Sequence, residues 1–396
     1  MSYTKVCIAG LSAAGKTTLL RELGEQMPEF EIIDGSHRLC ELAKCSIEEL
    51  KILSRDRLDS LRMQFLDFVQ NTQANLIVSG HYSFLMNDGS YDIAMKEDAR
   101  FYDMVLFLDT DCNVICERLN QRGVNLTLES IQQWNAFELR GLQNACKRHN
   151  TLFSAIDFQA SEVAKFIYFI HNKKELVIPS AVFSSFMQER ALKPTIILSD
   201  CDGTLDNKDG VKEFYKIPSV ADYGVNDVFH GHRFYGAYQF FRLTQKRLEL
   251  DEGVFYSACK RAAHSLDLAP QLVETLQTTS ASLIAITAGI RAIWQEVFHR
   301  YEIAFQLVAN DRHTIIFEDT KAYFARELTR LGFRVIALGD GLVDVGMLEY
   351  ATKPILIESK KTESIISRLS KEAQNRLIIC QQNRLADSIK AAYENL

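Results

Sequence analysis

The sequence predicts an α/β protein with two doubly wound parallel-sheet domains. Three observations lead to this fold class. Short apolar runs alternate with longer stretches of helical spacing, two of these runs lead straight into loops rich in glycine or aspartate, and a segment with Pro179, Pro194 and several serines separates the halves. We expect one domain at 1–178, a linker at 179–193 and a second domain at 194–396.

In the first half, four apolar runs are expected to be strands. They are KVCIAG, FEIID, NLIVSG and MVLFLD. Stretches with helical spacing, among them 47–70 and 128–148, separate them, and 161–176 has the pattern of a closing helix. Because parallel strands need long crossover connections, this alternation predicts a parallel sheet with helices on both faces.

The second half repeats the pattern. Its expected strands are TIILSD, SLIAIT, TIIFED, RVIALGD and KPILIES. About 75 residues lie between the first two, which is too long for a loop in a compact domain. This stretch, at about 207–279, is rich in aromatic residues and has helical character, so we expect an inserted helical cap.

Composition excludes some partners and locations. Lys and Arg number 45 against 51 Asp and Glu, a formal net charge of −6, so no broad cationic surface is expected for the phosphates of long nucleic acid. No apolar stretch approaches the roughly 20 residues that span a bilayer, and the N-terminus begins with a strand-like run instead of a leader. We expect a cytoplasmic protein outside the membrane, and nothing in the sequence predicts its oligomeric state.

The nine cysteines are scattered and include no CxxC pair. The closest two, Cys112 and Cys116, have the spacing of one helix face, which is a weaker indication of a metal site. We expect reduced, buried thiols.

Residues 10–17, GLSAAGKT, fit the pattern G-x-x-x-x-G-K-[ST] between an expected strand and an expected helix. Such a loop wraps its backbone N–H groups around a polyphosphate. Lys16 should then reach the β and γ phosphates of ATP, and Thr17 should contact Mg²⁺. The residues expected to bind ATP are Gly10, Ser12, Ala13, Ala14, Gly15, Lys16, Thr17 and Thr18.

Charged residues follow two other strands of the first half. Asp34 and Arg38 come after FEIID, where Asp34 would accept a proton from an acceptor hydroxyl or, alternatively, would cap a helix at 37–44. Arg118 and Arg122 come after MVLFLD at positions i and i+4. They would stabilise a transferring phosphoryl group, or they would form a solvated helix face.

Residues 4–150 resemble the archaeal-type adenylate kinases and related small P-loop kinases. The resemblance rests on GLSAAGKTT, IIDGSHRLCELA, NLIVSGHYSF and MVLFLDTDCNVICERLNQRG. It implies a kinase in which a carboxylate at the end of the third strand organises the Mg²⁺ shell. Here His81 stands at the expected place but Ser79 replaces the carboxylate, so either Asp34 or Asp109 substitutes for it or phosphoryl transfer is weak.

The second half carries four motifs in order. Asp200-Cys201-Asp202-Gly203-Thr204 follows TIILS, Thr287 ends SLIAIT, Lys321 lies near a helix start, and GDGLVD occupies 339–344. These motifs resemble those of the haloacid dehalogenase (HAD) superfamily, which implies a Rossmann-like fold. The GDGxxD ending and the cap are most similar to the phosphoserine-phosphatase branch, although Val343 stands where that branch usually has Asn.

Each motif position has a chemical reason. Asp200 would attack phosphorus and form an aspartyl-phosphate, and Asp202 would protonate the leaving oxygen. Thr287 would donate a hydrogen bond to the phosphoryl group, and Lys321 would offset the crowded negative charge. The residues expected around the Mg²⁺ ions of the two halves are Asp200, Asp202, Asp340, Asp344 and Thr17, with Asp202 contributing its carbonyl and Asp344 orienting the shell.

The favoured hypothesis is a bifunctional enzyme. Its N-terminal domain would be an ATP-dependent kinase of nucleotides or other small hydroxylated molecules, and its C-terminal domain would be a Mg²⁺-dependent HAD phosphatase of small phosphomonoesters. One alternative is a polynucleotide 5′-kinase and 3′-phosphatase. Another, motivated by Ser79, is a phosphatase that a catalytically weak nucleotide-sensing domain regulates.

Overall fold

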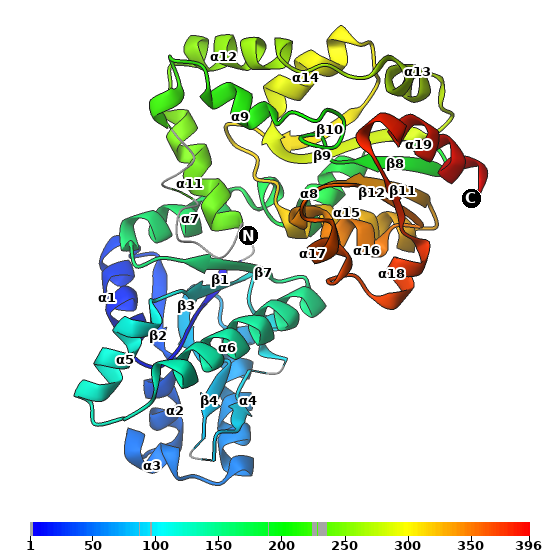
Figure 1. The fold of residues 1–396 in the computed structure, drawn as a ribbon. Helices are drawn as coiled ribbons and strands as arrows, with labels where there is room; N and C mark the ends of the chain where they lie inside the picture. Colours follow the sequence, from blue (N-terminus) through cyan, green and yellow to red (C-terminus); the bar gives the residue numbers. More distant parts are fainter. Residues whose placement is uncertain (1–2, 87, 96, 189, 224–227, 229–235) are drawn as a thin grey trace. The chain divides into compact units, whose positions relative to one another are not determined.

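The chain divides into two compact units, Met1–Asn172 and Lys173–Leu396. The computed structural model describes residues 3–86, 88–95, 97–188, 190–223, 228 and 236–396. Each unit has a parallel sheet with helices around it, which confirms the predicted α/β class (Figure 1).

The sheet of the first unit has five parallel strands in the order β2-β3-β1-β6-β7. Its strands are β1 (Lys5–Ala9), β2 (Phe30–Asp34), β3 (Asn75–Gly80), β6 (Met104–Leu108) and β7 (Leu152–Ile156), and a separate antiparallel hairpin joins β4 (Ser83–Leu85) to β5 (Tyr91–Ile93). Every residue of β6 and β7 is buried, as expected of strands covered on both faces. The four expected strands are present.

Strand β7 has no counterpart among the expected strands. It follows the long helix α6 after only Asn150 and Thr151, and it contains Ser154, so its short apolar run is hard to separate from the end of the helix. Asn150 is in the left-handed conformation that ends the helix.

The helices of the first unit are α1 (Lys16–Gln26), α2 (Gly35–Ala43), α3 (Ile47–Lys51), α4 (Arg55–Asn71), α5 (Cys112–Gln121), α6 (Leu128–His149) and α7 (Ala160–Asn172), with a 3-10 turn η1 (Asp98–Phe101). The expected helix at 47–70 is two helices. Ser46 and Ser54 are the N-cap residues of α3 and α4. The Ser46 hydroxyl accepts a hydrogen bond from Glu49 N at 3.2 Å, which satisfies one of the free amides at the start of α3.

The sheet of the second unit has six parallel strands in the order β10-β9-β8-β11-β12-β13. They are β8 (Thr195–Ser199), β9 (Ser282–Ile290), β10 (Gln306–Asn310), β11 (Arg334–Gly339), β12 (Lys353–Ile357) and β13 (Ile378–Cys380). Alternate residues face two separate hydrophobic cores: Ile197 belongs to one, and Ile196 and Leu198 belong to the other.

The expectation of a strand at TIIFED is wrong. Residues 314–317 have no regular structure, and α15 begins at Glu318. Ile315 and Ile316 are fully buried, but their amides bond outside any ladder, to Leu176 O at 2.8 Å and to Asn310 Oδ1 respectively. The run is apolar because it lies in the core, so its composition resembles that of a buried strand.

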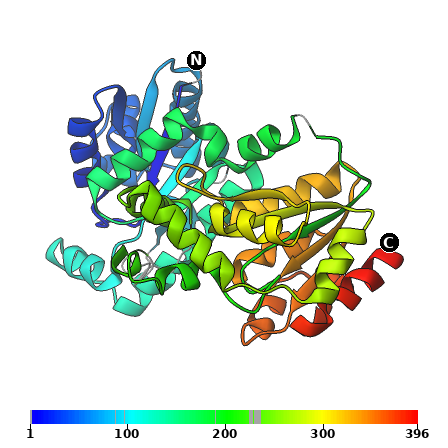
Figure 2. The ribbon, with the colours of Figure 1, turned by 90° about the horizontal axis from the view of Figure 1, so that it is seen from above.

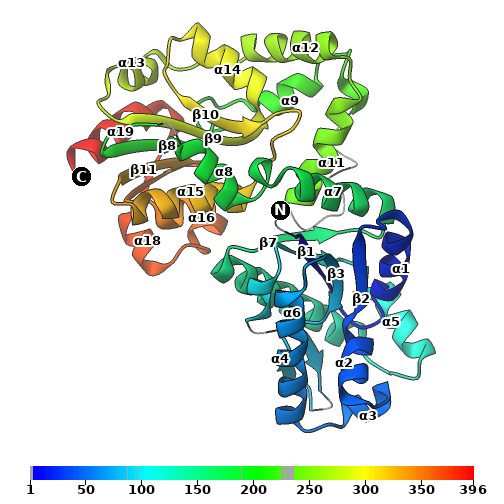
Figure 3. The ribbon, with the colours of Figure 1, turned by 180° about the vertical axis from the view of Figure 1, so that it is seen from behind.

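The helices of the second unit are α8 (Pro179–Met187), α9 (Gly210–Tyr215), α11 (Ala237–Leu248), α12 (Glu252–His264), α13 (Pro270–Thr278), α14 (Arg291–Arg300), α15 (Glu318–Arg330), α16 (Val345–Tyr350), α17 (Thr362–Ile366), α18 (Lys371–Arg376) and α19 (Leu385–Glu394). Its 3-10 turns are η2 (Lys174–Leu176), η3 (Ala221–Tyr223), η4 (Leu342–Asp344) and η5 (Gln382–Arg384). Helices α12 and α14 lie on one side of the sheet and α15 and α16 on the other (Figure 3). Helix α19, near the C-terminus in Figure 2, packs on the same side as α12 and α14, because its Ile389 belongs to the same hydrophobic core as Ile197. No helix of the described ranges is long and apolar enough to cross a membrane.

The insertion between β8 and β9 is helical, as expected, but much of it is not a separate cap. Its residues 224–227 and 229–235 lie outside the described residues. Phe214, Phe255 and Leu272, from α9, α12 and α13, belong to the same hydrophobic core as Ile197 of the sheet. The insertion therefore supplies one covering layer of the sheet.

The expected linker at 179–193 contains helix α8. Phe183 and Phe186 pack edge-on against Phe324 of α15, with ring centroids 5.1 and 5.3 Å apart. Val182 joins them in the core on that face of the sheet. Pro179 occupies the start of the helix, a position that proline favours, so it does not mark a loop here.

All nine cysteines are free. Cys112 and Cys116 lie on α5 as expected. The expectation that every thiol is buried is wrong for Cys40, Cys45 and Cys116, which are partly exposed.

The packing of α8 predicts that Phe186→Ala destabilises the second unit by about 3–5 kcal/mol, because the large ring is removed from a closed core. Urea unfolding of the full chain measures this change. Leu331→Ala, at a residue that is 50% exposed, should change the free energy of unfolding by less than about 0.5 kcal/mol. An equally small effect of Phe186→Ala would mean that α8 is a detached linker.

Candidate active sites in the two units

The loop between β1 and α1 has the geometry of a phosphate-binding loop. Gly15 precedes the first turn of α1 with φ 107°, a backbone conformation that strains a residue with a side chain. The Lys16 ammonium donates hydrogen bonds to Gly10 O at 2.7 Å and Leu11 O at 2.9 Å. Burial lowers the pKa of Lys16 to about 8, although nearby carboxylates oppose the shift. Thr17 and Thr18 are exposed on the first turn of α1.

Asp34 has the capping role, which is one of the two that the sequence left open. It is the N-cap residue of α2, and its Oδ1 accepts hydrogen bonds from Ser36 N at 3.0 Å and His37 N at 3.2 Å. Its Oδ2 accepts from the Thr17 hydroxyl at 3.4 Å. One oxygen therefore fixes the carboxylate on the helix, and the other faces the phosphate-binding loop.

Ser79 does not face that loop with its hydroxyl. It is buried, and its Oγ accepts a hydrogen bond from Gly35 N at 3.2 Å. The hydroxyl therefore joins the ends of β3 and β2, and Asp34 is the carboxylate that the described contacts place beside Thr17.

Of the two predicted arginines, the structure brings one to the loop. Arg118 of α5 donates from Nη1 to Ala13 O at 3.0 Å and Ala14 O at 3.2 Å. Arg122 is the exposed C-cap residue of α5, and in the described ranges it has no contact with the loop. Arg38 also lies away from the loop and pairs with Glu41 at 2.7 Å.

The sequence analysis missed Glu138. This fully buried carboxylate accepts hydrogen bonds from Tyr82 N and Ser83 N, each at 2.9 Å, and from the Ser83 hydroxyl at 2.7 Å. Burial raises its pKa. Glu138 lies on the same buried face of α6 as Trp134 and Leu142. A charged residue at a position of the apolar helix face is the sequence signal that could have identified Glu138.

A cavity of about 90 Å³ lies beside α2 and the end of β3. Its lining residues are Gly35, Ser36, Leu39, Arg62, Phe65, Leu66, Ser79, Gly80, His81, Phe84, Ala94, Met95, Asp98 and Tyr102. Burial raises the pKa of Asp98 to about 6, and Arg62 opposes that shift. His81 has a buried Nδ1 without a hydrogen-bond partner in the described structure, and burial holds its pKa well below the usual value.

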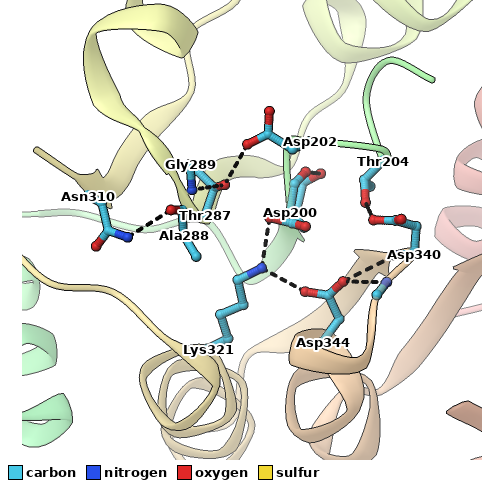
Figure 4. Close-up of polar contacts among 12 residues, drawn as sticks. Asp200, Asp202, Thr204, Thr287, Ala288, Gly289, Asn310, Lys321, Asp340 and Asp344 are labelled. Atoms are coloured by element: carbon cyan, nitrogen blue, oxygen red, sulfur yellow. Dashed lines mark hydrogen bonds and ion pairs between the residues drawn. The ribbon is translucent and has the colours of Figure 1, made fainter. Parts of the chain in front are cut away.

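In the second unit, a buried ammonium lies between two carboxylates. Lys321 of α15 is fully buried, and its Nζ lies 2.8 Å from Asp200 Oδ1 and 2.7 Å from Asp344 Oδ1 (Figure 4). Burial alone would lower the pKa of Lys321, but the two carboxylates outweigh it and raise the pKa above its ordinary value. Asp200 directly follows β8, and Asp344 ends the turn η4.

Asp340 completes this cluster from the end of β11. Its Oδ1 accepts from the Thr204 hydroxyl at 3.1 Å, and burial followed by the charge of Asp344 raises its pKa to about 6. Gly203 has φ 76°, and a Cβ there would lie 2.6 Å from Asp340 Oδ2, so only glycine fits.

The carboxylates of Asp200, Asp340 and Asp344 have the donor chemistry of a divalent-cation site. Each offers one oxygen within 4.8 Å of the others, and burial together with mutual repulsion raises the pKa of Asp200 and Asp340. Asp344 already uses Oδ1 for Lys321 and Oδ2 for the amides of Asp340 and Gly341. The residues therefore fit Mg²⁺, with Asp344 in an orienting position.

The Asp202 carboxylate lies outside that group of three. Its Oδ1 accepts from Gly210 N at 2.6 Å, and its Oδ2 accepts from the Thr287 hydroxyl at 3.4 Å. Burial and the charge of Asp209 raise the pKa of Asp202 to about 7. Thr287 Oγ1 in turn accepts from Gly289 N at 2.9 Å, which fixes the hydroxyl beside Asp202 (Figure 4).

Two supporting residues were also missed. Thr204 orients Asp340, and the signal for it was its place directly after Gly203 in the first motif. The buried Asn310 donates to Ala288 O at 2.7 Å and so holds the end of β9 that follows Thr287. No local pattern marks Asn310, because its partner lies on the neighbouring strand.

Comparison with protein families concerns the first unit. Residues 6–133 match the model of the AAA domain. The matched region includes the phosphate-binding loop, Asp34 and Arg118. The match ends within α6, so it leaves the second unit undescribed.

Comparison with solved structures found matches at low identity and low TM-score. Shikimate kinase from Acinetobacter baumannii is 16% identical over 44% of this chain and 96% of that chain, with a TM-score of 0.33. A probable phosphoserine phosphatase from Vibrio cholerae is 18% identical over 52% and 67%, with a TM-score of 0.36. Phosphoserine phosphatase from T. onnurineus is 20% identical over 51% and 98%, with a TM-score of 0.33. The comparison with curated proteins found no match.

The raised pKa of Asp98 predicts a pH-dependent gain in stability for Asp98→Asn. The pKa of Asp98 is about 6 in the folded protein, against roughly 3.9 for an unfolded aspartate, so the fold favours the protonated carboxyl group. The stability that this group contributes is therefore fully present below about pH 4 and is lost as the pH rises through 6. The substitution should raise the free energy of unfolding by about 1–3 kcal/mol at pH 8 and change it little at pH 4. Urea unfolding at both pH values measures this, and an equal gain at both would contradict it.

Proposed function

We propose that the chain is a bifunctional phosphoryl-transfer enzyme. The AAA domain uses ATP to phosphorylate a small hydroxylated acceptor, and the second unit is a Mg²⁺-dependent phosphatase of small phosphomonoesters. The observation that carries the phosphatase is the placement of Lys321 between Asp200 and Asp344, with Asp340 close by.

In the phosphatase, Asp200 is the nucleophile. Its free carboxylate oxygen attacks phosphorus, the bond from phosphorus to the leaving oxygen breaks, and Asp202 donates a proton to that oxygen. Asp202 then takes a proton from a water molecule that attacks phosphorus, and the bond to Asp200 breaks. The pKa of about 7 for Asp202 suits a group that gives and takes a proton near neutral pH.

The surrounding residues hold charge and geometry. Lys321 neutralises part of the negative charge that gathers when a phosphate joins three carboxylates. The Thr287 hydroxyl, which donates to Asp202 Oδ2 at 3.4 Å, would donate instead to a phosphoryl oxygen when substrate binds. Asp200 and Asp340 would hold Mg²⁺, which supplies electrostatic stabilisation of the phosphoryl oxygens.

In the kinase, Lys16 and Arg118 bind the transferring phosphates. Both side chains reach the same loop, where they now bond to backbone carbonyls. Asp34 accepts the proton of the acceptor hydroxyl, and Thr17, hydrogen-bonded to it, would contact Mg²⁺.

The cavity beside α2 favours a small acceptor. Gly35 and Ser36, the two residues after Asp34, line this cavity. Its volume of about 90 Å³ is far below the roughly 300–1,000 Å³ of sites for drug-sized ligands. This supports a small-molecule kinase over the polynucleotide alternative. Arg62 and Asp98 supply the charged groups that would bind polar substituents of the acceptor.

The phosphatase is tested with an aryl phosphate and Mg²⁺. Asp200→Asn should lower turnover about 100-fold or more, because an amide is a poor nucleophile. Asp387→Asn, at an exposed residue paired with Arg384, should retain full activity. Undiminished turnover by Asp200→Asn, purified free of other phosphatases, would refute the assigned nucleophile.

The kinase is tested in an Asp200→Asn background, so that the second unit does not remove the product. Labelled ATP is supplied with small alcohols, nucleosides, nucleotides and 5′-hydroxyl oligonucleotides. Lys16→Ala should reduce transfer to a small acceptor about 100-fold. Lys165→Ala, at an exposed lysine paired with Glu162, should not. The absence of Lys16-dependent transfer to any acceptor would count against the kinase, and transfer to oligonucleotides alone would favour the polynucleotide alternative.

A further inference from the structure

The turn that ends α2 has the hydrogen-bond pattern of a Schellman motif. Lys44 follows the helix in the left-handed region with φ 53°. Cys45 N donates to Cys40 O at 3.1 Å, and Lys44 N donates to Glu41 O at 3.3 Å. These are the outer and inner bonds that define the motif, so Cys40 and Cys45 hold its first and last positions.

The first and last side chains of this motif normally make an apolar contact. Here that contact joins two thiols. The Cys45 thiol is close enough to raise the pKa of Cys40, both residues are partly exposed, and no disulfide links them. The backbone bond between the same two residues holds them at the short separation that a disulfide requires.

This pair differs from the other cysteines. Six of the remaining seven are buried. The seventh, Cys116, is partly exposed, but its thiol donates to Leu126 O at 3.5 Å and accepts from Asn120 at 3.7 Å. It therefore serves as a matched control, because it is a partly exposed cysteine on a surface helix whose contacts with Leu126 and Asn120 involve no second thiol.

A metal centre does not fit the pair. Over the described ranges, Asp200, Asp340 and Asp344 form the one group of three metal-ligating side chains within 4.8 Å of one another. Two thiols without a third ligand leave a zinc ion short of its usual four. Redox chemistry needs only the two sulfurs.

We propose that Cys40 and Cys45 form a redox-active dithiol that a low-molecular-weight disulfide converts into an intrachain disulfide. The Cys45 thiolate attacks one sulfur of the oxidant, the S–S bond of the oxidant breaks, and one small thiol leaves. Cys40 loses its proton and attacks the Cys45 sulfur of the mixed disulfide, and the second small thiol leaves. Two electrons pass to the oxidant, and the two protons end on the released thiols.

The surroundings favour Cys45 as the attacking residue. Burial, the neighbouring thiol and the charge of Glu48 raise the pKa of Cys40, so less of it is thiolate. Cys40 lies on α2, whose Gly35, Ser36 and Leu39 line the cavity of the first unit, and Cys45 is the second residue after that helix. The proposal does not depend on the proposed function.

The sequence around the pair allows a direct test. Trypsin cleaves after Arg38, Lys44 and Lys51, so Cys40 and Cys45 fall in separate peptides, 39–44 and 45–51. The folded full chain is incubated with excess oxidised glutathione, its free thiols are alkylated in denaturant, and the digest is analysed by mass spectrometry. Most of the two peptides should appear as one disulfide-linked pair that dithiothreitol separates.

Three variants control the experiment. Cys40→Ser and Cys45→Ser should lose the linked pair, and the remaining cysteine of each should carry glutathione, because no second thiol resolves the mixed disulfide. Cys116→Ser should form the linked pair as the wild type does. The proposal is overturned if the wild-type peptides emerge unlinked, whether alkylated or each carrying glutathione.

Discussion

The ammonium of Lys321 is the interaction on which the site of the second unit depends. Its charge is fully buried, and Asp200 and Asp344 compensate for it from opposite sides. Removing one partner of a buried ion pair destabilises the folded protein by about 3–5 kcal/mol. The lysine and the two carboxylates therefore stabilise one another's positions. When ionised, the cluster has more negative than positive charge, because two carboxylates already face one ammonium and Asp340 adds a third. A divalent ion would balance that excess of negative charge. The carboxylates repel one another, and the buried lysine between Asp200 and Asp344 opposes their separation.

Both candidate sites follow the same rule of sheet architecture. In the first unit the loop leaves β1, which lies between β3 and β6, and in the second Asp200 leaves β8, which lies between β9 and β11. Connections on either side of such a central strand run to opposite faces, so the carboxyl end of the strand is left open to a ligand. Asp34 ends β2 and Asp340 directly follows β11, so each lies at the carboxyl end of a strand next to its site.

The parts of the fold that could be predicted are those that depend on local pattern. The phosphate-binding loop, the order of the HAD-like motifs and most strands follow from residues close together in sequence. The TIIFED segment failed because an apolar run records burial, and Ile315 and Ile316 are buried without a ladder. Strand β13 is three residues long, too short to show a period. At the sites, Asp34 and Arg118 were found by their place after strands, whereas Glu138 and Asn310 act on segments distant in sequence, so no spacing reveals them.

Helix α8 determines where the second unit can be separated from the first. Phe183 and Phe186 cover Phe324, and the carbonyl of Leu176, ahead of α8, accepts the amide of Ile315, just before the helix that carries Lys321. A recombinant fragment that starts at the first residue of β8 would leave this aromatic surface uncovered and the Ile315 amide without its acceptor. Expression of the phosphatase-like unit alone should therefore begin near Lys173, the boundary of the compact unit, and proteases that cut between α8 and β8 would yield a piece prone to aggregate.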